Sequence, residues 1–437
     1  MTTTSPLRPE DTVVELTADL VRFDTTNFGK GESRGERECA EYVAAKLASV
    51  GLEPTVLESA PRRANVVVRI PGADPGLDAL LVHGHLDVVP AEAKDWTHDP
   101  FSGAIEDGCL WGRGALDMKA MCASMLASAL SWAQRGVRPK RDVVFAFVAD
   151  EEDNGEYGAE FLATKHADLL EGCVAGISES GGMTNHVNGI RLYPVGAAER
   201  GTMHLKLTAH GRAGHGSRPN DENPVTRLVT TMSRIASYKW PIRLTPTVRA
   251  YLERTSAALG IAISLDDVDG AVELLGAAGQ LVIPTVRNSS TPTMLEAGYK
   301  VNVIPSVAYG QVDVRVLPGS EDEVLATIDS LLEPGVVREF VSRSTAVSAP
   351  IDTPWFEAMA SALRAEDPEA VVVPFCMGGG TDAKAFAPLG IAGYGFAPLY
   401  FPEGFPSRQL AHGVDERVPL EGLTFGARVL DRFLLSV

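Results

Sequence analysis

The chain has 437 residues, more than the roughly 250–300 residues that one hydrophobic core usually supports, so we expect two domains. Its 57 acidic and 39 basic residues give a formal net charge of −18. This charge repels phosphate backbones and anionic lipids, which argues against nucleic-acid or membrane-surface partners. With 45% hydrophobic and 22% charged residues, the composition is that of a globular protein.

The N-terminal segment MTTTSPLRPED lacks the apolar stretch of a secretory signal, and no later run is long and apolar enough to span a membrane. We therefore expect a cytoplasmic protein. The five cysteines form no C-x-x-C pair and are odd in number. We interpret them as reduced, packed thiols rather than as metal ligands or disulfides.

The first part of the chain alternates predicted helices and predicted strands. Apolar residues at helical spacing predict helices at 9–22, 36–50 and 118–134. Continuous apolar runs without polar alternation predict strands at 65–70, 79–82 and 143–148. Such runs are typical of strands that are buried on both faces. The pattern predicts an α/β fold with a mostly parallel mixed sheet.

The pattern changes near residue 198, where the predicted elements take the order β-α-β-β-α-β of a ferredoxin-like α+β plait. The strands fall at 202–209, 294–301, 308–316 and 336–342, and the helices at 223–238 and 321–332. Two further helices, at 247–259 and 266–275, belong to an elaboration over 245–293 whose role the pattern does not reveal. We expect residues 199–346 to form an inserted domain within a first domain of residues 1–198 and 347–437. The first domain resumes with a helix near 354 and a strand at 371–375.

The most informative motif is L-V-H-G-H-L-D-V-V-P at residues 81–90. Residues i and i+2 of an extended segment share a face. His85 can therefore bind a metal while Asp87 orients its imidazole by accepting the other N–H. Alone the pair is weak evidence, because a histidine after a buried strand is more often a hydrogen-bonded residue without a ligand.

Further metal-binding side chains follow in order along the chain. They are Asp117 in G-R-G-A-L-D-M-K, Glu151 and Glu152 in A-D-E-E, Glu179 in I-S-E-S, and His412 in A-H-G-V-D-E. They come directly after predicted strands or at a helix start, where open α/β sheets place their sites. An acidic run is ordinarily a solvated turn, but this one follows a buried strand within an ordered set, which favours a metal site.

Taken together, the motifs resemble the dizinc metallopeptidase family that includes aminoacylase, carboxypeptidase G, carnosinase-type dipeptidases and succinyl-diaminopimelate desuccinylase. The motifs are H-G-H-L-D-V-V-P, W-G-R-G-A-L-D-M-K, A-D-E-E, E-S, G-H-G-S-R-P, N-V-I-P, G-G-G-T-D-A-K and a late A-H-G. They span nearly the whole chain, and the combination is more specific than any single motif. The resemblance implies a zinc-peptidase catalytic domain with an inserted lid and dimerisation domain.

The resemblance also implies a role for each residue of the metal site. It implies two Zn²⁺ ions, which Co²⁺ or Mn²⁺ can replace. His85 and Glu179 would complete the site of one ion, Glu152 and His412 that of the other, and Asp117 would bridge the two ions. The resemblance also implies that the peptide bond between Asp117 and Met118 is cis. Glu151 would be the general base, and Asp87 the carboxylate behind His85.

This ligand set agrees with catalytic rather than structural metal chemistry. Each ion would receive one imidazole, one terminal carboxylate and a shared bridge, which leaves a position open for water. Two ions about 3.5–4 Å apart lower the pKa of that water to about 7 and polarise the scissile carbonyl. Glu151 would be the general base that takes the water's proton, so that hydroxide remains on the metal, and it would deliver this proton to the leaving nitrogen.

Several residues of the inserted domain resemble the family's substrate groups. His215 in A-G-H-G-S-R-P lies between glycines, with little to pack against. The resemblance implies that it reaches the neighbouring subunit's active site and stabilises the oxyanion, which requires a homodimer. Asn302 in N-V-I-P and Arg315 in D-V-R-V would contact the substrate, and the alternative for Arg315 is a surface charge on an edge strand. We expect this lid to close over the metals only with substrate present. Closure would bring Asn302 and Arg315 of its own chain, and the partner subunit's His215, onto the substrate.

A glycine-rich loop precedes the C-terminal part of the chain. Gly378, Gly379, Gly380 and Thr381 can present backbone N–H groups to an anion, because glycine lets the chain approach closely. We include Gly380 and Thr381 among the expected substrate-binding residues. A triple glycine is also common in ordinary turns, so this signal is weak by itself.

We therefore expect a metal-dependent hydrolase that cleaves an amide bond to release an amino acid from a small peptide or an N-acyl amino acid. The alternative is a non-catalytic, metal-binding regulatory relative of the same fold. Such a relative would usually lack a ligand or the base, and neither is missing here. Exopeptidase, dipeptidase and deacylase activities share this metal chemistry and differ in pocket shape, which the sequence does not reveal.

Overall fold

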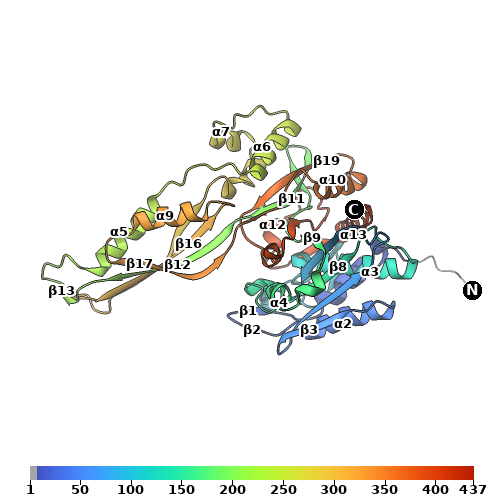
Figure 1. The fold of residues 1–437 in the computed structure, drawn as a ribbon, viewed down its shortest axis with the longest axis horizontal. Coiled ribbons are helices and arrows are strands. Elements are labelled where there is room, and N and C mark those ends of the chain that lie inside the picture. Colours follow the sequence, from blue (N-terminus) through green and yellow to red (C-terminus); the bar gives the residue numbers. More distant parts are fainter. Residues whose placement is uncertain (1–6) are drawn as a thin grey trace, which may run out of the picture. The chain divides into compact units, whose positions relative to one another are not determined.

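The computed structural model describes residues 7–437 (Figure 1). The chain divides into two compact units, which we call the first and the second unit. The first unit takes the chain up to Ala197 together with Ala349–Phe375 and Thr381–Val437. The second unit consists of Ala198–Ser348 and Cys376–Gly380, so it interrupts the first unit along the chain.

The first unit is built on a mixed sheet in the order β10-β11-β20-β9-β5-β8-β4-β3, with β19 also paired to β11. Its strands are β3 (Thr55–Ala60), β4 (Arg63–Ile70), β5 (Ala79–His85), β8 (Val143–Val148), β9 (Cys173–Ser178), β10 (Asn185–Val187), β11 (Ile190–Glu199), β19 (Ala370–Met377) and β20 (Ala392–Gly395). The central strands β20, β9, β5 and β8 are parallel, whereas β4, β3, β11 and β10 join antiparallel at the sides. The predicted α/β fold with a mixed sheet is confirmed, and its parallel part is the centre.

Helices cover both faces of this sheet (Figure 1). They are α1 (Pro9–Val21), α2 (Arg37–Ser49), α3 (Ala120–Arg135), α4 (Ala159–Lys165), α10 (Pro354–Glu366), α11 (Ala383–Phe386), α12 (Ser407–Leu410) and α13 (Leu420–Ser436). Leu80 and Val82 of β5 pack in a core with α1, α2, α3, α10 and α13, whereas Leu81 packs in a second core with α4 and α11. Alternate residues of β5 point to opposite faces of the sheet, and both faces are covered by helices. The sequence of β5 is therefore a continuous apolar run.

Two smaller sheets complete the first unit. The hairpin pairs β1 (Asn27–Gly29) with β2 (Glu32–Ser33), and a short antiparallel sheet has the order β21-β7-β6. The latter consists of β6 (Ala104–Glu106), β7 (Cys109–Trp111) and β21 (Arg417–Pro419).

Four of the five cysteines are buried, in line with their interpretation as packed thiols. No helix within residues 7–437 is both long and apolar enough to cross a membrane.

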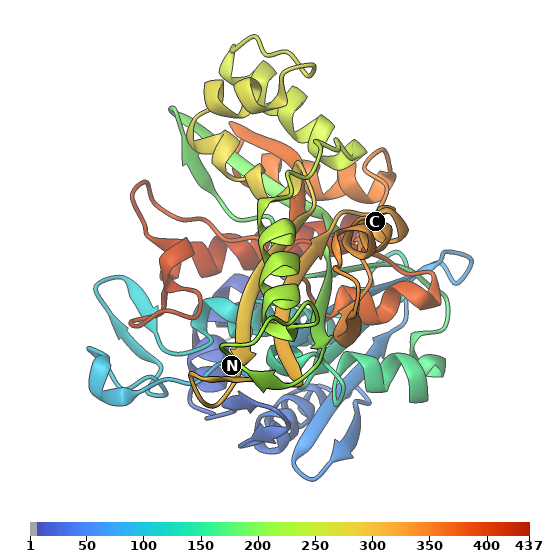
Figure 2. The same ribbon diagram turned by 90° about the vertical axis from the view of Figure 1, so that its left-hand side faces the viewer.

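The second unit has an antiparallel sheet in the order β14-β16-β12-β17. Along the chain its elements are β12 (Gly201–His210), α5 (Pro224–Ser237), β14 (Ser289–Ala297), β16 (Val307–Val316), α9 (Glu321–Leu331) and β17 (Val336–Ser344). Figure 2 shows α5 running along the strands, and apolar residues of α5 and α9 share one core with β12 and β16. Burial alternates along β16, as expected for a sheet with one covered face. The predicted ferredoxin-like order is confirmed.

The remaining elements of the second unit lie between or after these strands along the chain, and the last of them, β18, pairs with the end of β11. They are β13 (Gly214–His215), α6 (Pro246–Leu259), α7 (Val268–Leu274), α8 (Ala277–Gln280), β15 (Val303–Ile304) and β18 (Val347–Ser348). The two helices predicted within the elaboration are confirmed as α6 and α7. The Thr245 side chain caps α6 by accepting the Val248 N–H, and Gly260 ends it in the left-handed region.

One strand of the second unit differs from its prediction. We expected a strand at 294–301, but β14 spans Ser289–Ala297 and the chain turns after it. Gly298 has a φ of +74°, a left-handed conformation that ends the strand, and the pairing of β14 with β16 shifts register between Pro292 and Met294. The apolar residues Tyr299 and Val301, which suggested a longer strand, are exposed instead.

Candidate metal centre

The parallel strands bring the predicted ligands to one edge of the first unit's sheet. β5 ends at His85, and its neighbours β8 and β9 run parallel to it on either side. Glu151 follows β8 and Glu179 follows β9, so both leave the sheet at the edge where His85 lies. Asp117 comes from the irregular segment that precedes α3, where its peptide bond to Met118 is cis as expected.

Asp117 lies between the two predicted imidazole ligands. Its Oδ1 is 3.2 Å from Nε2 of His85, and its Oδ2 is 3.2 Å from Nε2 of His412. The same His412 nitrogen is 3.2 Å from Oε2 of Glu152. One carboxylate therefore faces two imidazoles with separate oxygens, the arrangement that a bridging ligand requires.

Two overlapping groups of side chains lie close enough to share a cation. His85, Glu151 and Glu179 offer ligand atoms that all lie within 4.8 Å of one another, and so do His85, Asp117 and Glu152. The structure therefore brings all five predicted ligands and the predicted base into one cluster.

The second hydrogen bond of His85 differs from the one we expected. Its Nδ1 lies 2.9 Å from the backbone carbonyl oxygen of Asp87, whereas the Asp87 carboxylate is 3.6 Å away. A carbonyl oxygen only accepts, so neutral His85 carries its proton on Nδ1 and keeps Nε2 for a cation. The Asp87 carboxylate instead accepts the backbone N–H groups of Glu151 and Glu152, each at 3.1 Å, and the Asn27 amide at 2.9 Å.

Crowding of half-buried carboxylates perturbs their protonation. Burial, reinforced by the Glu179 carboxylate, raises the pKa of Glu151 well above its usual range. Burial and the Asp117 carboxylate likewise raise the pKa of Glu179. A raised pKa makes a carboxylate a stronger base, which suits it to accept a proton.

The same negative surroundings also raise the pKa values of both imidazoles. Burial opposes charge on His85, but its hydrogen bond to Asp117 and the nearby glutamates hold its pKa well above the usual value. Hydrogen bonds to Asp117 and Glu152 raise the pKa of His412 to about 10. The cluster therefore favours positive charge at both imidazoles.

The chemistry of this donor set fits divalent cations. Oε1 of Glu152 is buried and has no hydrogen-bond partner among residues 7–437. An unpaired buried carboxylate oxygen is costly unless a cation or donor meets it. Two imidazole nitrogens with several carboxylates form the mixed N/O set that zinc and similar ions bind. His85, Asp117, Glu152, Glu179 and His412 can therefore hold metal.

A buried charge network lies behind the acidic turn, and the sequence analysis did not identify it. Arg63 donates to Asp150 at 2.6 Å and to Glu36 at 2.9 Å, and all three side chains are buried. Asn27 connects the network to the site by donating to Asp87 at 2.9 Å and to Asp150 at 3.1 Å. Asp150 belongs to the quoted A-D-E-E motif, but nothing in the local sequence marks Arg63 or Glu36 as buried.

Two predicted residues of the second unit lie side by side. β13 pairs with β15, which places His215 opposite Val303, and the Gly216 N–H donates to the Asn302 carbonyl at 2.9 Å. His215 and Asn302 are both exposed. The His215 Nδ1 lies 2.8 Å from the Ser217 hydroxyl, so the ring is oriented by its own turn rather than by packing.

Arg315 lies at the opposite end of β16 from Asn302. Arg315 pairs with Thr202 near the start of β12, whereas Val307, at the other end of β16, pairs with His210. The structure therefore does not bring Arg315 and Asn302 together. The Arg315 guanidinium donates to Asp313 at 2.8 Å and to the Thr202 hydroxyl at 3.0 Å, so part of its donor capacity is engaged.

The glycine-rich loop crosses the boundary between the units, which falls between Gly380 and Thr381. Its Gly378 carbonyl accepts a hydrogen bond from Arg200 at 3.2 Å. A Cβ atom added to Gly379 would meet no atom within 4 Å, so this part of the loop is open. The Thr381 hydroxyl accepts the Ala383 N–H at 3.2 Å, which is a turn contact rather than evidence for a ligand.

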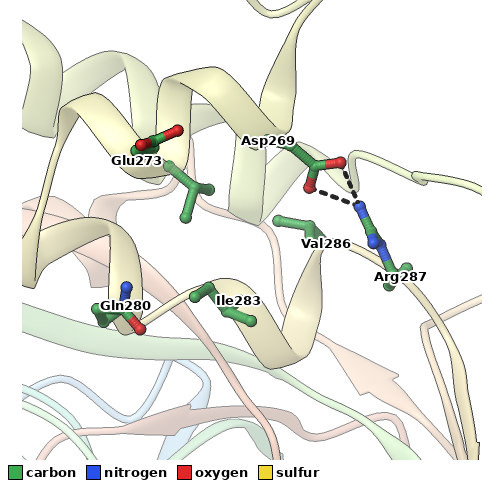
Figure 3. A pocket seen from close by; sticks show the side chains of 7 residues that line it. Asp269, Glu273, Gln280, Ile283, Val286 and Arg287 are labelled. Carbon is green, nitrogen blue, oxygen red and sulfur yellow. Dashed lines mark hydrogen bonds and ion pairs between the residues drawn. The ribbon is translucent and has the colours of Figure 1, made fainter.

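The elaboration of the second unit contains a separate pocket of about 310 Å³. Its lining residues are Asp269, Val272, Glu273, Gln280, Ile283, Val286 and Arg287. Figure 3 shows Arg287 turned toward Asp269, to which it donates at 2.6 and 2.9 Å. The Asp269 carboxylate thus neutralises the Arg287 guanidinium within the pocket. No motif in the sequence indicated a site at these residues.

A cluster of imidazoles and carboxylates at the edge of a mixed α/β sheet is typical of metal-dependent enzymes. Residues 81–436 match peptidase family M20/M25/M40, and the chain belongs to this family. It is accordingly a hydrolase of the peptidase and amidohydrolase class.

Individual relatives support this assignment. The chain is 26% identical to the N-fatty-acyl-amino acid synthase/hydrolase PM20D1 of Mus musculus, over 97% of this chain and 87% of the relative. It is 26% identical to aminoacylase-1 of Sus scrofa, over 86% of this chain and 84% of the relative. Its fold resembles that of the M20 family metallo-carboxypeptidase Sso-CP2 from Sulfolobus solfataricus, with a TM-score of 0.71, 17% identity, and coverage of 97% of this chain and 98% of that one.

Proposed function

We propose that the protein uses two Zn²⁺ ions to hydrolyse an amide bond and release an amino acid. One ion would be held by His85 and Glu179, the other by Glu152 and His412, with Asp117 shared. The observation that carries this proposal is the position of Asp117, which presents a different oxygen to each imidazole at 3.2 Å. When bound, the two ions would polarise the scissile carbonyl and acidify the attacking water.

Glu151 would act as the general base and then as the general acid. Its side chain belongs to the cluster with His85 and Glu179, and its backbone N–H is held by Asp87 at 3.1 Å. Glu151 would accept a proton from the attacking water and transfer it to the leaving nitrogen. The raised pKa of Glu151 supports this role, because burial makes its carboxylate a stronger base.

Small N-acyl amino acids are the substrate class that we propose first, with short peptides as the second. Support comes from the two relatives described above, of which one is named an N-fatty-acyl-amino acid synthase/hydrolase and the other an aminoacylase. Both substrate classes place an amide beside an amino-acid carboxylate. Arg315 is suited to grip such a carboxylate, and Gly380 and Thr381 would supply backbone N–H groups to an anion.

We also propose that the active protein is a homodimer formed through the second unit. His215 would stabilise the oxyanion in the partner subunit's site. Asn302 adjoins His215 through the hydrogen bond from Gly216 to the Asn302 carbonyl, so it would serve the same site as His215 rather than act beside Arg315 as we expected. Arg315, at the far end of β16, would act within its own chain.

A combined metal and substrate experiment tests this function. Protein reconstituted with Zn²⁺ would be assayed for metal content and for hydrolysis of a panel of N-acyl amino acids and dipeptides. We expect two ions per chain and release of a free amino acid, with Glu151→Gln as the control that keeps the metals. Metal binding without hydrolysis of any member would favour the non-catalytic alternative, and no metal binding would contradict the site itself.

A further inference from the structure

A buried ion pair connects two loops that carry proposed metal ligands. Arg113 lies four residues before Asp117, and Glu416 lies four residues after His412. The two side chains are 4% and 0% exposed, and Arg113 Nη1 donates to Glu416 Oε2 at 2.6 Å. Both residues stand inside motifs that drew attention in the sequence, but the function proposed above assigns neither of them a role.

Glu416 holds the backbone of the Asp117 segment with both carboxylate oxygens. Its Oε1 accepts the N–H groups of Leu116 at 2.7 Å and Asp117 at 3.0 Å. Its Oε2 accepts the Gly114 N–H at 3.0 Å in addition to the Arg113 guanidinium. All four partners are donors, so the site suits an ionised carboxylate. A glutamine at this position would place its amide N–H against one of these donors.

Arg113 reaches the other loop with its second arm. Its Nη2 donates to the carbonyl of Gly413 at 2.9 Å and approaches that of His412 at 3.4 Å. The guanidinium is also stacked over Trp96, with 5.1 Å to the ring centroid. The His412 side chain is 55% exposed, so packing alone does not orient it. Its orientation depends on the position of its loop and on its contacts with Asp117 and Glu152.

We propose that Arg113 and Glu416 are positioning residues that set the separation between Asp117 and His412, and thereby the affinity for metal. Asp117 would serve both ions, whereas His412 would serve one of them. Loss of the Glu416 carboxylate should therefore weaken both ions. Loss of the Arg113 fork should mainly weaken the ion held by Glu152 and His412. The inference rests on the metal site proposed above.

A purely structural role is the competing explanation, because breaking any buried ion pair destabilises a protein. A matched pair in the same unit separates the two explanations. Asp367 accepts two hydrogen bonds from Arg191, both at 2.6 Å, and its side chain is 7% exposed. Its carboxylate also accepts the Tyr193 hydroxyl and the Glu369 N–H, and none of these partners is a proposed ligand. Asp367→Asn is the control.

The test measures metal affinity and spectrum rather than turnover. Chelator-treated wild type, Glu416→Gln, Arg113→Lys and Asp367→Asn would each be titrated with Co²⁺ alone while its visible absorption bands are recorded. Melting temperatures would be measured in parallel. Substitutions behind metal ligands cost about 10–100-fold in affinity. We expect a loss of this size for both ions in Glu416→Gln, with altered bands, and for one ion in Arg113→Lys.

Asp367→Asn should lower the melting temperature and leave the Co²⁺ affinity and spectrum unchanged. A folded Glu416→Gln with wild-type affinity and spectrum would overturn the positioning role while the proposed function stands. Equal affinity losses in Glu416→Gln and Asp367→Asn would also overturn it. If Glu416→Gln does not fold, Arg113→Lys tests the positioning role instead, because lysine keeps the positive charge but lacks the forked guanidinium. Wild type that binds no Co²⁺ would overturn the metal site and the positioning role together.

Discussion

The Asp87 carboxylate accepts the backbone N–H of Glu151 at 3.1 Å, although 64 residues separate them along the chain. Its second oxygen accepts the N–H of the adjacent Glu152 at the same distance. One buried carboxylate thus holds the turn that carries both the proposed base and a proposed ligand. The aspartate of the H-x-D motif therefore contributes to the site mainly through this turn and, by its carbonyl, through His85.

Replacing Asp87 by asparagine should impair catalysis more than substrate binding. The amide would present an N–H group where one of the turn's N–H groups needs an acceptor, so the turn should shift. We expect kcat to fall by about 10–100-fold, the range for groups that support metal ligands, with little change in KM. Asp142→Asn, in a partly exposed pair with Arg69, is the matched control and should retain wild-type kcat. An Asp87→Asn enzyme with normal kcat would contradict this role.

Glu151→Gln should retain the metals and lose the reaction. Glutamine keeps the shape of the side chain but cannot accept the water's proton. We expect turnover to drop by about 10²–10⁴, the usual contribution of a positioned general base. Metal analysis of the same preparation would show whether both ions remain. Unchanged turnover would remove Glu151 from the mechanism.

His412→Ala should convert a two-ion protein into a one-ion protein. His412 contacts Asp117 and Glu152, whereas His85, Glu151 and Glu179 form a group that does not include it. The ion held by His85 and Glu179 should therefore remain. Elemental analysis after dialysis against a large volume of chelator-free buffer measures the number of ions bound per chain. Retention of both ions with normal affinity would exclude His412 as a ligand.

The stability of the protein should depend on pH through Glu36, which is not a proposed ligand. Burial and the nearby Asp87 carboxylate raise the pKa of Glu36 from 4.5 to about 8, against the opposing effect of Arg63. Between these values the folded protein holds a proton that the unfolded chain has released. Its stability therefore falls as the pH rises through this window and levels off above it.

Glu36→Gln removes that titration and should flatten the dependence. Melting temperatures of the two proteins, measured from pH 4.5 to about 8 after chelator treatment, give the comparison. We expect the wild type to lose more stability than the variant toward the upper end. Two parallel curves would show that Glu36 does not titrate in this window.

Subunit mixing tests whether His215 acts across a dimer. His215→Ala and Glu151→Gln subunits should each be inactive alone. In a hybrid dimer, one site would combine an intact metal centre with the partner's intact histidine, so activity should return. Asn302→Ala should behave like His215→Ala in this assay, because the two residues are neighbours. No recovery despite proven subunit exchange would mean that His215 acts in its own chain or not at all.

Local patterns in the sequence determined the elements and the chemistry of the site. The run at 143–148 predicted β8 to the residue, because a strand buried on both faces must be apolar throughout. His85, Asp117, Glu151, Glu152, Glu179 and His412 could be chosen because they form an ordered set of metal-binding side chains whose motifs resemble those of the dizinc metallopeptidase family. The cap residues Thr245 and Gly260 likewise act within one turn of their own helix. Such features depend on neighbours in the chain, and the sequence shows those directly.

Only the tertiary structure decided which groups support the site. Arg113 and Glu416 are 303 residues apart, and nothing in either motif indicates that the two side chains meet in the interior. The Asp87 carboxylate was expected on His85 but turns to the backbone of Glu151, because strand register and loop geometry place those donors nearer. Burial of a charged residue depends on contacts between distant segments. Periodicity describes single segments, so it could not supply these pairings.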